Sequence, residues 1–133
     1  MTKNLLRTIY TLAASMLLIG TLTSAPAFAV TLNILALGAS NTNGVGVGAS
    51  EAWPAQLENM LRAKGYDAHV SVNAINGQTS DQVFGRANYI GSGAQVVVFD
   101  TGGDNDRKHG MSIADTNANV ARIMAAIKAT AIT

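Results

Sequence analysis

Hydrophobic and polar residues are arranged along the chain in blocks that predict three strands, each followed by a helix. Residues 31–37 form a short apolar run that ends at Gly38, as expected of a buried strand. Residues 68–75, which end before Asn76-Gly77, and residues 94–100 are expected to form two further strands, and the last block is rich in β-branched residues between glycines. Strands that alternate with helices pair in parallel through right-handed crossovers, so the pattern predicts an α/β fold.

Apolar residues at helical spacing predict the helices, and polar residues mark their ends. Ser50 is expected to cap the first helix and Gly65 to end it. Thr79 or Ser80 is expected to cap the second helix, which runs to about Tyr89. The expected buried face of the first helix consists of Trp53, Leu57, Met60 and Leu61.

The third helix is expected to begin after Ser112, whose hydroxyl can cap it together with the carboxylate of Asp115. Its expected apolar face consists of Ile113, Val120, Ile123, Met124 and Ile127. Three polar loops remain, at 38–49, 76–80 and 101–110. Each loop follows a strand, and parallel sheets bind ligands beyond the carboxyl ends of their strands, so these loops should converge on the candidate site.

The first 29 residues have the pattern of a secretory signal peptide. Two basic residues precede a mostly apolar stretch over 9–22, and small residues follow for cleavage after Ala29. A membrane anchor fits less well, because the stretch is shorter than the roughly 20 residues that a span needs and contains Thr and Ser. We therefore expect a periplasmic or secreted domain of 104 residues, 30–133, with no membrane span after cleavage.

Composition narrows the classes of function. Hydrophobic residues make up 48% of the chain and charged residues 13%, which excludes an intrinsically disordered protein. The formal net charge of +1 provides no basic surface for nucleic acid. The absence of cysteine excludes a disulfide framework, a cysteine zinc site and a thiol nucleophile.

One residue in each loop suits nucleophilic acyl transfer. Ser40 follows a buried strand, where its hydroxyl can be presented at the end of the sheet near backbone N–H groups. Gly77 has no side chain, so its backbone can approach a ligand closely. The side chain of Asn105 can donate a hydrogen bond to an oxyanion. Each residue alone is more typical of a turn or a cap, but all three follow successive strands in order.

These residues and their neighbours resemble the SGNH, or GDSL-type, hydrolases. The blocks that carry the resemblance are Gly38-Ala39-Ser40, Gly77, Gly103-Asp104-Asn105-Asp106 and the segment 52–57. The resemblance extends from about Asn33 to Ile127 and is closest to the bacterial arylesterase and lysophospholipase-like thioesterase branch. It implies a three-layer αβα, flavodoxin-like fold with a parallel sheet of about five strands, of which this chain carries about three.

The resemblance also implies the chemistry. Ser40 would be the nucleophile, and the backbone of Ser40 and Gly77, with the side chain of Asn105, would form the oxyanion hole. The substrate would be a small acyl ester or thioester, and neither a metal nor another cofactor is implied.

Two departures from the family pattern bear on activity. Ala39 stands where the family has the Asp of Gly-Asp-Ser. The family's fourth motif, an Asp-x-x-His near the C-terminus that supplies acid and base, does not follow the third helix. His69 is expected at the start of the second strand, which is the end opposite the candidate site. His109 is expected to be a solvated loop residue. Because a serine hydroxyl without a base is a poor nucleophile, we expect a C-terminally truncated, inactive form of an exported hydrolase.

Two other functions remain open. One is a non-catalytic relic or small-ligand binding module of the same fold. The other is a flavodoxin-like phosphate binder that uses residues 44–48, although these glycines lack the Gly-x-Gly-x-x-Gly spacing. With no fourth strand beside it, segment 94–99 would form an apolar edge without charged residues, so self-association is expected.

Overall fold

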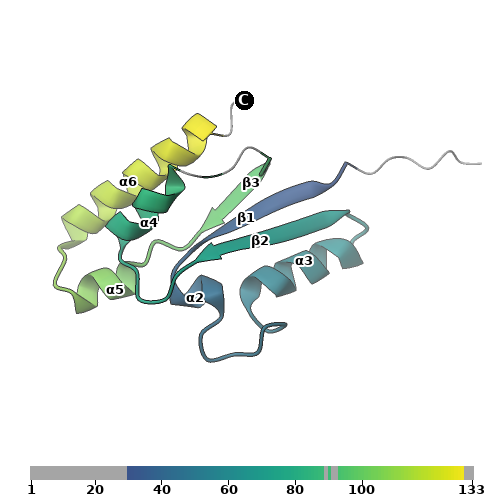
Figure 1. Ribbon diagram of the computed structural model, residues 1–133, viewed down its shortest axis with the longest axis horizontal. Coiled ribbons are helices and arrows are strands. Elements are labelled where there is room, and N and C mark those ends of the chain that lie inside the picture. Colours follow the sequence, from purple (N-terminus) through teal and green to yellow (C-terminus); the bar gives the residue numbers. More distant parts are fainter. Residues whose placement is uncertain (1–29, 89, 91–92, 131–133) are drawn as a thin grey trace, which may run out of the picture.

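A three-stranded parallel sheet lies at the centre of the computed structural model, which describes residues 30–88, 90 and 93–130 (Figure 1). The strands are β1 (Leu32–Gly38), β2 (Ala68–Ala74) and β3 (Val96–Phe99), in the order β2-β1-β3. In the register, Ile34 of β1 lies opposite Val70 and Val96. The predicted signal peptide lies outside the described residues.

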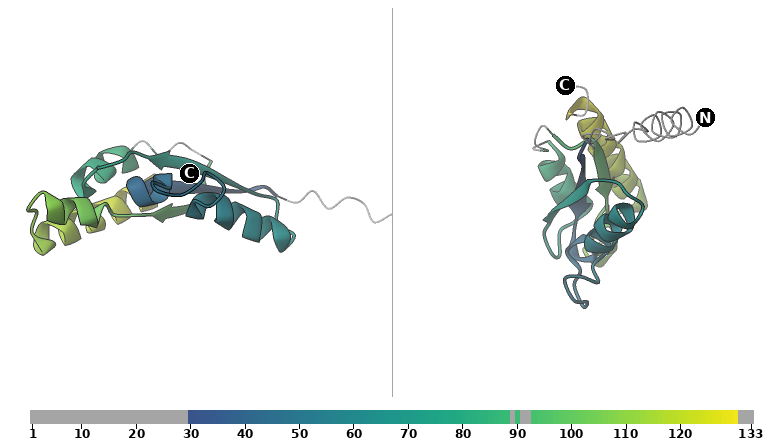
Figure 2. Two further views of the ribbon diagram at one scale, coloured as in Figure 1. Left: turned by 90° about the horizontal axis from the view of Figure 1, so that it is seen from below. Right: turned by 90° about the vertical axis from the view of Figure 1, so that its right-hand side faces the viewer.

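Helices cover both faces of the sheet and complete the expected three layers. They are α2 (Ser40–Asn43), α3 (Trp53–Ala63), α4 (Ser80–Ala87), α5 (Gly103–Lys108) and α6 (Ile113–Thr130). Helix α3 packs on the face that carries Ile34 and Val70. Helices α4 and α6 pack on the opposite face, around Leu37. In the right-hand view of Figure 2, α3 and α4 lie on opposite sides of the strands, so the α/β, three-layer prediction is confirmed.

Two helix starts agree with the sequence. Thr79 caps α4 in a capping box with Gln82, whose side chain accepts the N–H of Thr79. At the start of α6, the hydroxyl of Ser112 accepts the N–H of Asp115 at 3.1 Å and donates to its carboxylate at 2.6 Å. The predicted end of α3 is also correct, because Gly65 follows it with a positive φ of 88°.

The predicted start of α3 at Ser50 is wrong. The N-cap is Ala52, and Pro54 lies in the first turn, where a missing N–H costs nothing. Glu51 instead accepts the N–H of Gly48 at 2.8 Å, so the preceding residues form a turn of their own.

Two segments that the sequence analysis treats as loops contain short helices, α2 and α5. Neither helix has an apolar face to detect, because their buried residues are Thr42 in α2 and Asn105 and Asp106 in α5. Both helices are held by polar contacts, which hydrophobic periodicity does not register.

Helix α6 buries a narrower face than expected. Ile123 is fully buried and Ile127 packs beside it, as predicted. Ile113 and Met124, however, are 81% and 46% exposed, and Asn119 is buried instead. The reason is that α6 packs mainly against α4, so only the stripe through Asn119 and Ile123 faces inward. In the described part of the chain, no helix has the length and apolar character needed to cross a membrane.

Candidate active site

Ser40 begins α2 directly beyond the carboxyl end of β1. The turn that leads into it is tight: a Cβ on Gly38 would overlap the hydroxyl oxygen of Thr42 and lie 2.9 Å from the Cβ of Asp100. The N–H of Ala39 donates to Asp100 Oδ2 at 3.4 Å, which ties this turn to the end of β3. The chain thus presents Ser40, which is half-buried, at the end of the central strand.

Gly77 lies in the loop after β2, with φ at +78°, and its neighbours contact both other candidate segments. Asn43 of α2 donates from Nδ2 to Asn76 Oδ1 at 2.9 Å. Asn105 of α5 donates from Nδ2 to the carbonyl of Gln78 at 2.8 Å. The structure therefore brings the three predicted segments together around Gly77. In Figure 1, α2 and α5 lie on the side toward which the arrowheads of β2 and β3 point.

Gly102 allows the third segment to pack closely against the second. It has a φ of +71°, and a Cβ there would lie 2.6 Å from the carbonyl oxygen of Gln78. Only glycine combines this conformation with so close an approach of two backbones. Helix α5, which starts at the next residue, is held against the loop that carries Gly77.

Asp106, one residue after Asn105, has a fully buried carboxylate that anchors two other helices. Its Oδ1 accepts the N–H of Ser80 at the start of α4, and its Oδ2 accepts the hydroxyl of Thr116 in α6, both at 2.7 Å. Burial acts to raise the pKa of Asp106, but hydrogen bonds from Ser80 and Thr116 and the nearby His109 together lower it below its ordinary value. The carboxylate is therefore charged and fixes α5 between α4 and α6.

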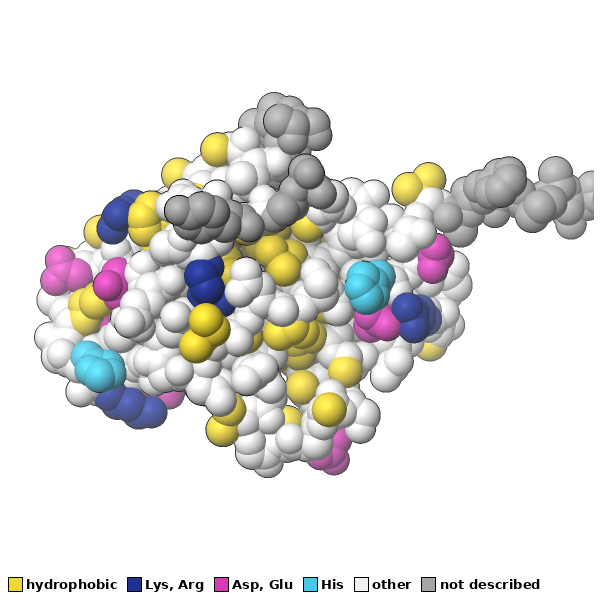
Figure 3. Space-filling view, in the orientation of Figure 1, with side chains coloured by type: hydrophobic (Ala, Val, Ile, Leu, Met, Phe, Trp, Pro, Cys, Tyr) yellow, Lys and Arg dark blue, Asp and Glu magenta, His cyan; other side chains and the backbone are white. Residues whose placement is uncertain are grey.

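Neither imidazole of the chain is hydrogen-bonded to Ser40 in the part that the structure describes. His69 lies at the amino end of β2, as expected, where it pairs with Glu58 at 3.5 Å. His109 is exposed and caps the end of α5. In Figure 3 the two histidine side chains, in cyan, lie near opposite ends of the molecule.

Asp106 and His109, in α5 and its cap, have the Asp-x-x-His spacing, but they lie in the third loop segment and not near the C-terminus, where the family has this motif. The carboxylate of Asp106 faces inward, where both oxygens already bind Ser80 and Thr116. Asp106 thus acts as an anchor for helices, and this motif does not place an acid behind an imidazole that faces Ser40.

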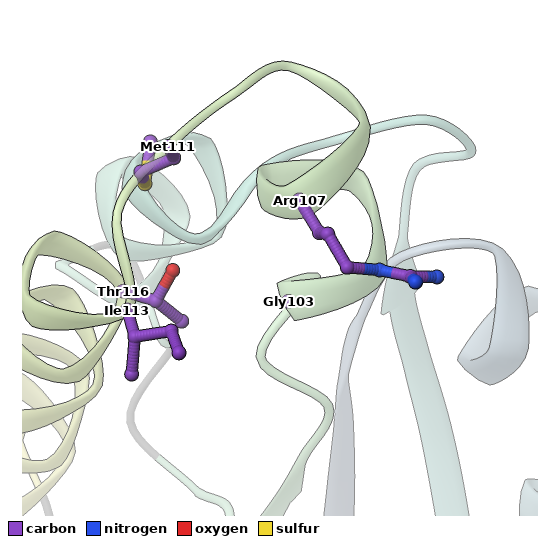
Figure 4. Close-up of a pocket in the computed structure, with 5 residues that line it drawn as sticks. All are labelled: Gly103, Arg107, Met111, Ile113 and Thr116. Atoms are coloured by element: carbon purple, nitrogen blue, oxygen red, sulfur yellow. The ribbon is translucent and has the colours of Figure 1, made fainter.

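A cavity of about 270 Å³ lies between α5 and α6 (Figure 4). Its lining consists of Gly103, Arg107, Met111, Ile113 and Thr116. Gly103 and Arg107 are four residues apart and share one face of α5, whereas Asn105 lies between them on another face. The cavity therefore lies on a different face of α5 from the one that carries Asn105. Among the described residues, no three His, Cys, Asp or Glu side chains are grouped to hold a metal.

A family model and several solved structures are similar to this chain. Residues 36–133 match the model of the GDSL-like Lipase/Acylhydrolase family. A search of curated proteins gave no match. Among solved structures, AlinE4, described as an SGNH-hydrolase family esterase, matches with a TM-score of 0.67 and 27% identity over 74% of this chain and 54% of its own. TesA matches with a TM-score of 0.68 and 29% identity over 74% of this chain and 56% of its own.

A third solved structure shares the fold at lower identity. The psychrotrophic esterase EstA from Pseudoalteromonas sp. matches with a TM-score of 0.60 and 22% identity, over 75% of this chain and 55% of its own. This chain spans about half the length of each of these three solved proteins. The described sheet and helices therefore correspond to one part of their fold.

Proposed function

The chain belongs to the GDSL-like Lipase/Acylhydrolase family, whose members use a serine nucleophile, and on this premise we propose that Ser40 is the nucleophile of an ester-hydrolysing site. Its position supports the role, because Ser40 follows a buried central strand and begins a helix. The substrate class that we propose is a small acyl ester or thioester.

The oxyanion of the tetrahedral intermediate would be bound by the N–H groups of Ser40 and Gly77 and by Nδ2 of Asn105. Neither of these backbone N–H groups has an acceptor among the described residues, and Asn105 uses one of its two amide N–H groups on Gln78. The observation that carries the proposal is the pair of hydrogen bonds that join the two neighbours of Gly77 to α2 and α5.

We further propose that this chain alone hydrolyses esters very slowly, because no described imidazole is bonded to Ser40. Export through residues 1–29 to the periplasm or medium remains part of the proposal. The alternative of a non-catalytic binding module rests on the same observation, that no described imidazole is bonded to Ser40.

Hydrolysis of p-nitrophenyl butyrate, with and without added imidazole, tests these roles. Imidazole supplies an external base, so it should accelerate hydrolysis more in the wild-type chain than in Ser40→Ala. Equal rates in the two proteins would contradict Ser40 as nucleophile and favour the binding module. A high rate without imidazole that Ser40→Ala abolishes would support the nucleophile but contradict the proposed inactivity, and would point to a resident base such as His109.

A further inference from the structure

The guanidinium of Arg86 makes four hydrogen bonds where β1 and β2 end. Its Nη2 donates to the carbonyl of Gly38 at 2.7 Å, and its Nη1 donates to both the carbonyl and Oδ1 of Asn73, also at 2.7 Å. Its Nε donates to Oε1 of Gln78 at 2.8 Å. Arg86 lies in the last turn of α4, and helical side chains lean toward the helix N-terminus, so this one reaches back to the strand ends.

The acceptors of Arg86 stand next to the candidate oxyanion donors along the chain. Gly38 lies two residues before Ser40, and Gln78 directly follows Gly77. The carbonyl of Gln78 also accepts the hydrogen bond from Asn105. The guanidinium of Arg86 therefore holds the two segments whose N–H groups are proposed to bind the oxyanion. It also holds Gln78, whose carbonyl accepts the hydrogen bond from Asn105.

The charge of Arg86 is not neutralised locally. All four acceptor atoms are neutral, and no carboxylate in the described part of the chain forms an ion pair with it, whereas Arg62 pairs with Glu58 and Arg107 with Asp104. Desolvation by burial lowers the pKa of Arg86, but an arginine stays protonated at neutral pH. A fixed positive charge beside a site where negative charge develops stabilises that charge.

We propose that Arg86 is a positioning residue of the oxyanion-binding site, which sets the spacing of the Ser40 and Gly77 N–H groups through the carbonyl of Gly38 and the side chain of Gln78. The inference rests on the proposed function of that site. The planar fork of a guanidinium can serve three directions at once, whereas a lysine ammonium is a point charge on a flexible stem. Arg86→Lys should therefore keep the positive charge but lose the arrangement of hydrogen bonds to Gly38, Asn73 and Gln78.

Arg62 provides a matched control. Its Nε donates to the carbonyl of Ala68 at 2.9 Å, and its Nη1 pairs with Glu58 at 2.9 Å, at the amino end of β2. Arg62→Lys therefore perturbs the two contacts of another arginine at the end of the sheet that is remote from Ser40. If Arg86 contributed only to stability, Arg86→Lys and Arg62→Lys would have the same effect on the oxyanion-binding site.

The experiment compares the full chain with Arg86→Lys, Arg86→Met and Arg62→Lys. The first readout is the set of ¹H–¹⁵N signals from the backbone amides of Ser40 and Gly77 and the side-chain amide of Asn105. The second is the dissociation constant of phenylboronic acid, a probe that forms a tetrahedral anionic adduct with a serine hydroxyl. Arg86→Lys should shift all three signals and weaken binding roughly tenfold or more, since hydrogen bonds to a charged group are lost. Arg62→Lys should leave both readouts unchanged.

Site signals and probe affinity in Arg86→Lys that match those of Arg62→Lys would overturn the inference. Arg86→Lys carries the test by itself if Arg86→Met does not fold. Ser40→Ala separates this inference from the proposed function: equally tight probe binding in that variant would refute the proposed nucleophile, and the amide signals would then decide the role of Arg86 by themselves.

Discussion

The side-chain amide of Asn105 donates a 2.8 Å hydrogen bond to the main-chain carbonyl of Gln78. This bond joins α5, which follows β3, to the loop that follows β2. It accounts for a buried asparagine in a short polar helix, because a buried amide without a partner is costly. It also orients the amide and thereby fixes the direction of its second N–H.

Gly102→Ala should destabilise the chain, because the residue has a φ of +71° and a Cβ would meet the Gln78 carbonyl at 2.6 Å. We expect a loss of about 2 kcal/mol or more in the free energy of unfolding, measured with urea. Gly85→Ala is the control, since a Cβ in that position of α4 meets nothing within 4 Å. It should stabilise by about 0.5–1 kcal/mol, and equal effects of the two substitutions would contradict the proposed packing.

Asp106→Asn should lower the free energy of unfolding by about 2 kcal/mol at pH 7, because charge-assisted bonds to Ser80 and Thr116 are lost. The folded-state pKa of Asp106 is lowered, so the unfolded chain binds more protons near its own value of about 3.9. The stabilisation is therefore complete above that pH and is lost as the pH falls through the folded value. Urea unfolding at a series of pH values should show the difference between wild type and variant shrinking below about pH 4. A constant difference would contradict this account.

Thr42→Val should be neutral or stabilise the chain by up to about 1 kcal/mol. The hydroxyl of Thr42 is buried without a hydrogen-bond partner among the described residues, and valine has nearly the same shape. Thr116→Val is the counterpart, because that hydroxyl donates to Asp106 at 2.7 Å, and its loss should destabilise by about 1.5–3 kcal/mol. Thermal unfolding of the two variants measures both effects, and a large loss in Thr42→Val would show that its hydroxyl has a role.

The three strands and their parallel pairing follow from the sequence because their side chains obey simple rules. The runs around Ile34 and Val97 are apolar, the run around Val70 has apolar residues at alternate positions, and the alternation with helices implies the parallel sheet. Ser40, Gly77 and Asn105 can be placed after these strands by the same reasoning, because each lies in a segment that follows a strand end.

The short helices and the contacts of Arg86 leave no hydrophobic pattern in the sequence. Helices α2 and α5 bury Thr42, Asn105 and Asp106, which have no hydrophobic period. The acceptors of Arg86 are mostly carbonyl and amide oxygens, so nothing in their spacing identifies the arginine before the strands are brought together. The Asp-x-x-His of α5 has the spacing of the family's motif but not its place near the C-terminus, so spacing alone does not identify its role.

The edge of β3 should cause self-association of the purified chain. In the described residues β3 pairs only with β1, and Val96 and Val98 are 41% and 38% exposed. The N–H of Gln95 donates to the carbonyl of Asn33 in β1. By alternation, the backbone N–H and C=O groups of Val96 and Val98 point away from β1, toward the open edge. No charged residue lies within 94–99 to oppose pairing with another strand.

Size-exclusion chromatography with light scattering checks this expectation. The wild-type chain should elute as dimers or larger species, and Val98→Lys should shift it toward the monomer. Val47→Lys, in an exposed loop away from the edge, is the control and should change nothing. A cooperative, monomeric wild type at micromolar concentration would show that the edge is covered.

The central claim is that Ser40, Gly77 and Asn105 form one oxyanion-binding site. Titration of the ¹⁵N-labelled full chain with phenylboronic acid tests it most directly. We predict that the backbone signals of Ser40 and Gly77 and the side-chain signal of Asn105 shift along a single binding curve, and that Ser40→Ala abolishes all three shifts. Shifts confined to the cavity lined by Met111 and Ile113, or equal shifts in Ser40→Ala, would contradict the account.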